Sequence, residues 1–309
     1  MGVGEDIRAA HEATHVERRL TAIASASVER RITLVRQLHD HFVPRLVPKF
    51  LPQITKLLSD DDPAVRYQVV LLLQHLFDLH SKGFAKASGP LAGLVQDTRM
   101  DNRIAALGLL DKVSRQEPKA VLPQLAKLVE WLDNPLPGVQ APLLQLITDL
   151  GRRAPTAVAA QLAKQLGSRK PATVRNALVL LERVAEKQPA ALARAAPRLV
   201  KLLGHRDSAI QEQAGQMLIS AGAAGVAAVP RLLLRPLTAR KTDPELRLHA
   251  ILTAQPLAER DPKQFAPAVR HLAHDLSHQR WEIREQAALL LGIMGRKNMG
   301  LIKDAVPSL

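Results

Sequence analysis

Two histidines and a glutamate near the N-terminus have the spacing of a catalytic zinc site. Residues 11–15 read HEATH, so that His11 and His15 are four residues apart and Glu12 stands between them. On a helix this spacing places both histidines on one face, where H-E-x-x-H metalloproteases bind zinc and use the glutamate as a general base. The chemistry that this pattern predicts is metal-assisted hydrolysis.

The other parts of a zinc site are missing from the sequence. A catalytic zinc needs a third protein ligand. The metzincin pattern has a glycine and a histidine where this chain has Arg18 and Thr21, and the gluzincin pattern has a glutamate where it has Val35. The nearest glutamate, Glu29, belongs to the next expected helix. We therefore interpret HEATH as a fortuitous match on the solvated face of a packing helix.

A second histidine group has helical spacing near the C-terminus. His271, His274 and His278 lie at positions i, i+3 and i+7, which places them within about 60° of one another on a helical wheel. With Asp275 these side chains could capture a divalent metal, but structural zinc sites normally have a closed, buried ligand set. We interpret the group as the solvent face of an amphipathic helix and assign no metal site.

Other motifs for catalysis are missing as well. The chain has no cysteine, which excludes disulfides, thiolate nucleophiles and Cys-ligated zinc. It has no G-x-S-x-G and no phosphate-cradling glycine-rich loop, and Trp131, Trp281 and Tyr67 are too scattered to form a base-stacking platform. We predict a non-enzymatic protein with no catalytic residue and no cofactor.

The composition predicts that helices position all of these residues. The 309 residues are 47% hydrophobic but only 3% aromatic, and good helix formers dominate. This favours an all-α protein with enough apolar residues for a core. The N-terminus lacks the apolar region of a targeting signal, and no stretch approaches 18 uncharged apolar residues. We expect a soluble intracellular protein, cytoplasmic or, in a eukaryote, also nuclear.

One short pattern recurs along the chain. Each copy has a polar turn, then an aliphatic residue or asparagine, then arginine, then a helix with an apolar stripe, as in DDDPAVRYQVVLLL (60–73). The arginine slot, called the anchor below, holds Arg30, Arg66, Arg103, Gln140, Arg175, Gln211, Arg247 and Arg284. The steps between them are 36, 37, 37, 35, 36, 36 and 37 residues. So regular a period indicates a solenoid.

A second amphipathic helix precedes each anchor, and proline recurs early in it. Proline is tolerated at the first turn of a helix and produces a kink elsewhere. These prolines, 13 to 17 residues before their anchors, are Pro52, Pro90, Pro123, Pro197, Pro230 and Pro267. Each unit therefore consists of a proline-bearing first helix, a turn that often holds aspartate, and a second helix that carries the anchor.

These features resemble the HEAT-repeat family, an armadillo-type helical repeat, over nearly the whole chain. Gln140 and Gln211 depart from the arginine of the family pattern, and the fifth unit lacks the proline. The resemblance implies a right-handed α-solenoid of about eight two-helix repeats with a period of about 36 residues.

We expect one continuous solenoid domain. A divergent N-terminal repeat or cap covers 1–46, seven HEAT-like repeats cover 47–300, and 301–309 starts a further helix or forms a C-terminal cap. The last segment is also compatible with a fragment of a longer solenoid, or with an end that another subunit covers. The sequence leaves the oligomeric state open.

The anchors are expected to form a structural ladder. Residues at one slot of every repeat line up along a stack, so an arginine there can bridge to the turn carboxylate of a neighbouring repeat. Gln140 and Gln211 keep a hydrogen-bond donor in this slot without the charge.

The positive charge is concentrated in the middle of the chain. The formal net charge is +14, and residues 1–150 hold 18 Lys and Arg against 17 Asp and Glu, whereas residues 151–250 hold 17 against 6. Equivalent turns align along one edge of a solenoid, which predicts a basic ridge for an anionic partner. The ridge consists of Arg152, Arg153, Arg169, Lys170, Arg206, Arg240, Lys241 and Arg280. The alternative is an arginine-rich solvated surface.

Three functions are compatible with this sequence. The first, which we favour, is an interaction scaffold that binds a protein or peptide on the face built from second helices. The second is a nucleic-acid-binding protein whose ridge contacts the phosphate backbone with steep salt dependence. The third is a helical-repeat enzyme such as a HEAT-like DNA glycosylase or a bilin lyase, although no cluster of Trp or Tyr around an Asp supports it.

Overall fold

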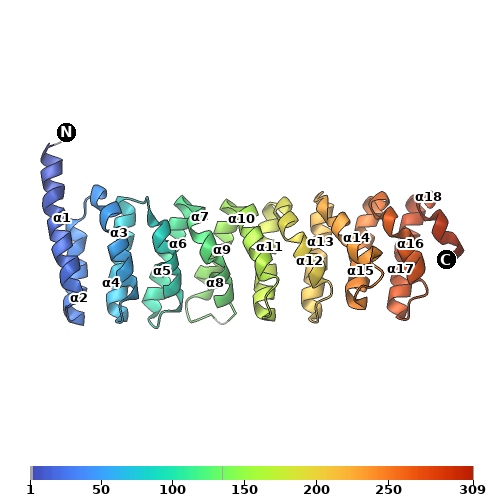
Figure 1. Ribbon diagram of the computed structural model, residues 1–309, viewed down its shortest axis with the longest axis horizontal. Coiled ribbons are helices and arrows are strands. Elements are labelled where there is room, and N and C mark those ends of the chain that lie inside the picture. Colours follow the sequence, from blue (N-terminus) through green and yellow to red (C-terminus); the bar gives the residue numbers. More distant parts are fainter. Residues whose placement is uncertain (1–2, 134, 309) are drawn as a thin grey trace. The chain divides into compact units, whose positions relative to one another are not determined.

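The computed structural model describes residues 3–133 and 135–308. These residues form 18 α-helices and nine short 3-10 helices, and the two described ranges contain no strand. The prediction of an all-α protein is confirmed. The outermost residues of the predicted segments 1–46 and 301–309 lie outside the described ranges. The chain divides into two compact units, Met1–Ala154 and Pro155–Leu309, which are described separately (Figure 1).

Unit 1 contains four repeats, each with a first segment and a second helix. The first segments are α1 (Val3–Ile23), then η2 (Pro44–Leu46) with α3 (Val47–Lys56) and η3 (Leu57–Ser59), then η4 (Phe84–Ala87) with α5 (Ser88–Gly93) and η5 (Leu94–Gln96), then α7 (Pro118–Val121) with η6 (Leu122–Gln124) and α8 (Leu125–Trp131). The second helices are α2 (Val28–Leu38), α4 (Pro63–Leu79), α6 (Met100–Gln116) and α9 (Gln140–Arg153), and η1 (His39–His41) follows α2.

Unit 2 contains the next four repeats. The first segments are α10 (Pro155–Gln165), then η7 (Pro189–Arg194) with α12 (Ala196–Leu202), then α14 (Ala228–Thr238), then η8 (Pro262–Ala268) with α16 (Val269–Asp275). The second helices are α11 (Pro171–Lys187), α13 (Ser208–Ala223), α15 (Pro244–Arg260) and α17 (Trp281–Lys297). The described chain ends in α18 (Met299–Ile302) and η9 (Lys303–Ser308).

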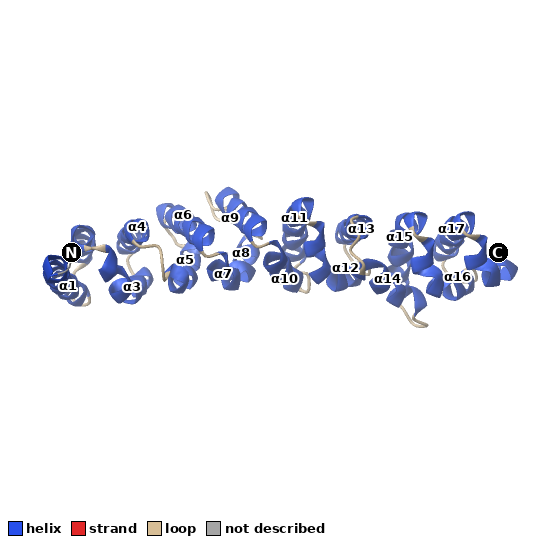
Figure 2. Ribbon diagram, turned by 90° about the horizontal axis from the view of Figure 1, so that it is seen from above, coloured by secondary structure: helices blue, strands red, loops and turns tan. Residues whose placement is uncertain are grey.

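Within each unit the first segments form one layer and the second helices form the other (Figure 2). In unit 2, α11, α13, α15 and α17 pack against one another in that order, and α12 and α14 pack in the opposite layer. Proline explains why the first segments are the more broken ones, because it removes a backbone donor. Pro123 lies in η6 and Pro267 in η8, where short 3-10 pieces replace a continuous α-helix.

The core lies between the two layers of each unit. It is filled by Leu, Val, Ile and Ala, and three of the five phenylalanines complete it from the first segments. Phe50 and Phe84 in unit 1 and Phe265 in unit 2 are fully buried. The long apolar stripes on the second helices meet these side chains, so that every repeat depends on both of its helices for a core.

Aspartates in the turns start several second helices. The Asp207 carboxylate accepts the backbone N–H groups of Ala209 (3.0 Å) and Ile210 (3.4 Å), which satisfies donors that a helix leaves unpaired at its N-terminus. Asp62 and Asp243 cap α4 and α15 in the same way. An aspartate immediately before the first residue of the helix therefore has a local cause in each of these turns.

Replacing Asp207 with alanine is expected to lower the free energy of unfolding by about 1–2 kcal/mol. The variant loses an N-cap, which contributes about 1 kcal/mol, and a half-exposed ion pair with Arg175 at 2.7 Å, which contributes less. Urea unfolding followed by circular dichroism measures the change. Glu212→Ala on the same helix is the control, because Glu212 is exposed and has no partner among the described residues. An Asp207→Ala variant as stable as this control would contradict the capping role.

Candidate binding surfaces

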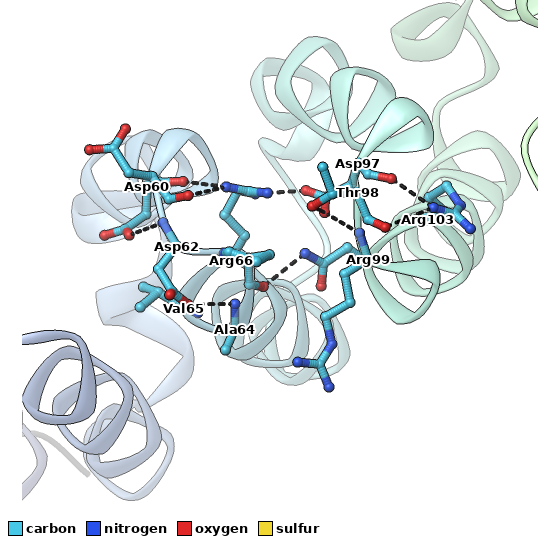
Figure 3. Close-up of polar contacts among 12 residues, drawn as sticks. Asp60, Asp62, Ala64, Val65, Arg66, Asp97, Thr98, Arg99 and Arg103 are labelled. Atoms are coloured by element: carbon cyan, nitrogen blue, oxygen red, sulfur yellow. Dashed lines mark hydrogen bonds and ion pairs between the residues drawn. The ribbon is translucent and has the colours of Figure 1, made fainter.

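Arg66 connects two repeats of unit 1 (Figure 3). Its Nε donates to Oδ2 of Asp97 at 2.6 Å, and its Nη1 donates to the backbone carbonyls of Asp60 (2.6 Å) and Asp61 (3.0 Å). Arg66 lies on α4, whereas Asp97 lies in the turn before α6. The side chains are largely buried, with 14% of Arg66 and 2% of Asp97 exposed. The arginine thus fastens the second helix of one repeat to the turn of the next.

The carboxylate of Asp97 is held in its charged form. Burial raises its pKa, but hydrogen bonds from Arg66, from the backbone N–H of Arg99 and from Asn102, together with the Arg66 charge, outweigh burial and lower the pKa below its ordinary value. The same hydrogen bond from Arg66 to Asp97 raises the pKa of the arginine. Both partners therefore remain ionised at neutral pH.

Two anchors of unit 2 make the same type of bridge. Arg247 Nε donates to Oδ2 of Asp275 at 2.8 Å, and this pair is buried, with exposed side-chain fractions of 8% and 3%. Arg175 Nη1 donates to Oδ2 of Asp207 at 2.7 Å in a more exposed pair. Arg284 donates only to turn carbonyls. Bridges from an anchor arginine to the turn of the next repeat thus occur in both units.

Other anchor positions do not reach a carboxylate. Arg103 donates to three backbone carbonyls, Gln211 donates to one, and Gln140 is exposed at the start of α9. In the first repeat, Arg31 rather than Arg30 bridges to the next turn, through Asp60 at 3.0 Å. Arg30 is exposed on the outside of α2. In the first repeat the bridging arginine is thus Arg31, one residue after the predicted anchor Arg30.

The HEATH segment forms a packing contact between α1 and η1. Nδ1 of His41 is 2.7 Å from Oε2 of Glu12, and the rings of His15 and His41 stack with centroids 5.0 Å apart. The hydrogen bond to His41 lowers the pKa of Glu12. His11 is exposed. The glutamate that would serve as a general base is therefore engaged with a histidine outside the motif.

In the second histidine group, His271 and His274 lie on α16 and His278 follows the end of that helix. His274 is exposed, whereas His271 and His278 are half-buried. Nδ1 of His278 accepts the backbone N–H of Arg280 at 3.1 Å, and Asp275 is buried in its ion pair. The aspartate is thus unavailable to the histidines. In the ranges that the structure describes, no group of three or more His, Cys, Asp or Glu side chains could hold a metal ion.

The predicted basic ridge contains one cation whose charge is largely neutralised. Arg280 Nη1 lies 2.6 Å from Oε1 of Glu245, and its Nη2 lies 3.5 Å from Oε1 of Glu282. These hydrogen bonds raise the pKa of Arg280 and neutralise its charge locally. The exposed cations of the predicted ridge in the turns of unit 2 are Arg169, Lys170, Arg206, Arg240 and Lys241. Arg280 therefore contributes little positive potential to the predicted basic ridge.

Arg152 and Arg153 belong to unit 1 and not to the turns inside a repeat. They lie in the last turn of α9. Arg152 pairs with Asp149, and Nη1 of Arg153 donates to Oγ of Ser114 at 3.0 Å on α6. Both arginines thus contact residues of unit 1, and they do not belong to the basic turns of unit 2.

The second helices of unit 2 expose large aliphatic side chains. Leu252 on α15 is 37% exposed and Leu289 on α17 is 50% exposed, and each lies five residues after its anchor. Val179 on α11 is exposed as well. The sequence predicts that a partner binds on this face, but it does not identify the apolar side chains that are exposed there. The slot by itself does not identify them, because Leu180, five residues after Arg175, is buried.

The fold and the anchors define a class of protein: an all-α helical repeat with two layers of helices and a second-helix arginine that binds the neighbouring turn. The model of the adaptin N-terminal region matches residues 28–223, which is more than half of the chain. The chain belongs to the adaptin N-terminal region family, and the prediction of HEAT-type repeats is confirmed. Members of this family are typically non-enzymatic scaffolds.

Solved structures similar to this chain include the karyopherin Kap121p and importin beta. A mutant of Kap121p is 15% identical with a TM-score of 0.49, and the match covers 95% of this chain and 34% of that chain. Kap121p bound to the SUMO protease Ulp1p is 15% identical with a TM-score of 0.48, at 91% and 32% coverage. Importin beta is 12% identical with a TM-score of 0.47, at 93% and 42% coverage.

This chain therefore spans less than half the length of those proteins. The comparison with curated proteins gives no match. Among the described helices, none is long and apolar enough to cross a membrane.

Proposed function

We propose that this chain is an intracellular, non-enzymatic scaffold that binds a protein or peptide partner on the second-helix layer of unit 2. The observation that carries the proposal is the pair Leu252 and Leu289, which occupy the same slot in adjacent repeats. Burying the remaining exposed surface of each leucine in an interface contributes about 1 kcal/mol. A partner that covers both leucines would bury them together, as in the apolar core of a protein interface.

The helices that carry these leucines are held in register. Gln255 on α15 donates to Oε1 of Gln286 on α17 at 2.9 Å, and each glutamine lies three residues from the leucine on its own helix. The contact fixes the spacing of the two leucines before a partner binds. A preformed pair loses less conformational entropy on association than two mobile side chains.

The electrostatics of this layer also suit a protein partner. The second helices of unit 2 hold eight basic and seven acidic residues, so the layer is close to neutral. A groove of about 200 Å³ lies between α11 and α13 and is lined by both charged and apolar residues, among them Glu186, Ala185 and Met217. Mixed polarity of this kind is typical of protein interfaces.

Affinity capture from the source cells with the tagged full chain tests this function. The Leu252→Glu/Leu289→Glu variant is expected to lose a partner that wild type retains at about 0.5 M salt, because apolar contacts are not screened. Ala193→Glu/Ala227→Glu is the matched control: it adds the same two charges at exposed sites of the opposite layer. Quantitative mass spectrometry compares the three baits. Equal capture by all three, or equal loss in both variants, would contradict the proposed surface.

A further inference from the structure

The first segments of unit 2 carry cations almost exclusively. Across α10, η7, α12, α14, η8 and α16 there are eight Lys and Arg residues and a single carboxylate. That carboxylate, Asp275, is buried in its ion pair with Arg247. The eight cations, called the basic layer below, are Lys164, Arg194, Arg198, Lys201, Arg231, Arg235, Lys263 and Arg270.

All eight side chains of the basic layer are exposed. None of them forms an ion pair with any carboxylate in the described part of the chain. A folded protein usually intersperses charges of both signs, because like charges repel one another. Apart from Asp275 and from Asp261, which caps η8 two residues before Lys263, the carboxylates of the four repeats of unit 2 lie on second helices or in the turns before them. Most of the positive potential of the first segments is therefore not neutralised.

The first segments of unit 1 differ from this arrangement. They keep Glu12 and Glu17, which pair with His41 and Lys49 at 2.7 Å, and they also keep Glu130. Residues 44–59 and 84–96 of unit 1 also hold cations and no carboxylate, so the difference lies in its extent: in unit 2 the helical first segments of all four repeats lack an exposed carboxylate. The separation of charge in unit 2 therefore indicates a specific anionic partner.

We propose that the basic layer of unit 2 binds the phosphate backbone of a nucleic-acid duplex. Each of the four repeats contributes at least one cation, and adjacent helices stack at about 10 Å, so the layer extends for about 30 Å along the stack. Duplex DNA presents phosphates regularly over that distance, about nine base pairs. Five of the eight cations are arginines, which bind phosphate oxygens in a bidentate manner.

The side chains around these cations favour a duplex over other anionic partners. The large apolar side chains exposed in the four repeats of unit 2 are Val179, Leu252, Trp281 and Leu289, all on second helices. The basic layer thus offers no anchor for insertion into a membrane and no apolar centre for a protein interface. The first segments of unit 2 hold one Phe, Tyr or Trp residue, the fully buried Phe265, so unpaired bases would have no large aromatic ring to stack on.

Arg198 brings the basic layer close to one of the basic turns of unit 2. A Cβ atom added at Gly167 would lie 3.3 Å from Nη1 of Arg198, so the guanidinium of α12 lies against the turn that precedes α11. Arg169 is two residues from that glycine. A duplex on the basic layer would therefore have turn cations at its edge. The first segments would thus make the primary contact with the duplex, and the turns would make a secondary one.

Fluorescence anisotropy with a labelled duplex of about 20 base pairs and the full chain tests the proposal. With about five phosphate contacts, the affinity of wild type is expected to fall roughly 10²–10³-fold between about 50 and 200 mM salt. The variant Arg198→Glu/Arg231→Glu/Arg235→Glu is expected to bind at least about 30-fold more weakly at low salt, with a salt slope reduced by about three. All three positions are exposed, so circular dichroism and the melting temperature should be unchanged.

Two further variants make the result specific to the basic layer. Lys187→Glu/Arg296→Glu/Lys297→Glu changes the net charge by the same amount on second helices and should bind like wild type. Arg206→Glu/Arg240→Glu/Lys241→Glu removes turn cations and should have a smaller effect than the basic-layer variant. Equal losses in all variants, or a loss confined to the turn variant, would overturn the proposal.

Competition separates the duplex from other polyanions. Unlabelled duplex should displace the probe at lower concentration than single-stranded RNA, polyglutamate or vesicles that contain phosphatidylserine. Tighter binding of any of these three, or no duplex binding at about 50 mM salt, would also overturn the proposal. The inference fails independently of the scaffold function, because Leu252→Glu/Leu289→Glu tests the opposite layer and should still bind the duplex.

Discussion

The Asp275→Ala variant is expected to be less stable than wild type by about 3–5 kcal/mol. Asp275 receives a 2.8 Å hydrogen bond from Arg247, and both side chains are more than nine-tenths buried. Removing the carboxylate leaves a buried guanidinium without a counter-charge, which is among the largest costs of a single substitution. The carbonyls of Pro236, Leu237 and Ala239 still accept from Arg247, but they do not neutralise it.

Urea unfolding of the single and double variants measures this effect. An Arg247→Met/Asp275→Ala protein removes both charges and should recover most of the lost stability, because a buried ion pair contributes little compared with apolar side chains. The recovery separates the cost of an unpaired charge from the cost of a cavity. Asp275→Ala with a loss below about 1 kcal/mol, or a double variant less stable than the single one, would contradict the ladder role of Arg247.

Replacing Asp97 with alanine is expected to cost about 2–4 kcal/mol. The variant removes the partner of Arg66 and the acceptor of the Arg99 backbone N–H, which is bound at 2.9 Å. The expected loss is smaller than for Asp275, because Arg66 is 14% exposed and keeps the carbonyls of Asp60 and Asp61. Differential scanning calorimetry at neutral pH gives the value. A melting temperature equal to that of wild type within error would contradict this expected loss of stability.

The Asp97 bridge also predicts how stability depends on pH. Its pKa is lower in the folded protein than the value of about 3.9 in an unfolded chain. The stabilisation is therefore fully present above about pH 4 to 5, and it is lost as the pH falls through the lowered folded pKa. Wild type should lose more stability than Asp97→Ala between about pH 5 and pH 3. Parallel pH profiles of the two proteins would exclude a lowered pKa at this position.

Periodicity alone predicts the repeats and the slot that connects them. A step of 35 to 37 residues places equivalent side chains on every second helix, so the sequence by itself identifies Arg66 and Arg247 as bridging residues. The periodicity does not decide between Arg30 and Arg31, because both fit the pattern within one residue. That choice depends on the angle at which α2 faces the next turn, which is a property of tertiary packing.

The candidate surfaces are harder to predict for a related reason. A count of charges along the chain does not show which cations have partners: Arg280 appears as basic as Arg206 in the sequence, yet only Arg280 is paired with Glu245. The basic layer becomes visible when charges are grouped by helix rather than by turn. Exposure of Leu252 and Leu289 likewise depends on which side of α15 and α17 faces solvent.

The two layers of unit 2 thus differ in the partners that they suit. The second-helix layer is nearly neutral and exposes aliphatic side chains, whereas the first segments expose unpaired cations and no large apolar side chain. A scaffold with two chemically different faces can bind two partners at the same time without competition between them. In this account, unit 2 joins a protein partner to a nucleic acid.

Site-specific photo-crosslinking in the source cells tests this separation most directly. A benzophenone amino acid replaces Leu252 in one full-length chain and Arg231 in another, so that each probe reports on one layer. We expect adducts of Leu252 that proteases degrade and nucleases leave intact, and adducts of Arg231 that nucleases shorten. Adducts of the same kind from both positions, or no protein adduct from Leu252, would contradict the assignment of protein binding to the second-helix layer.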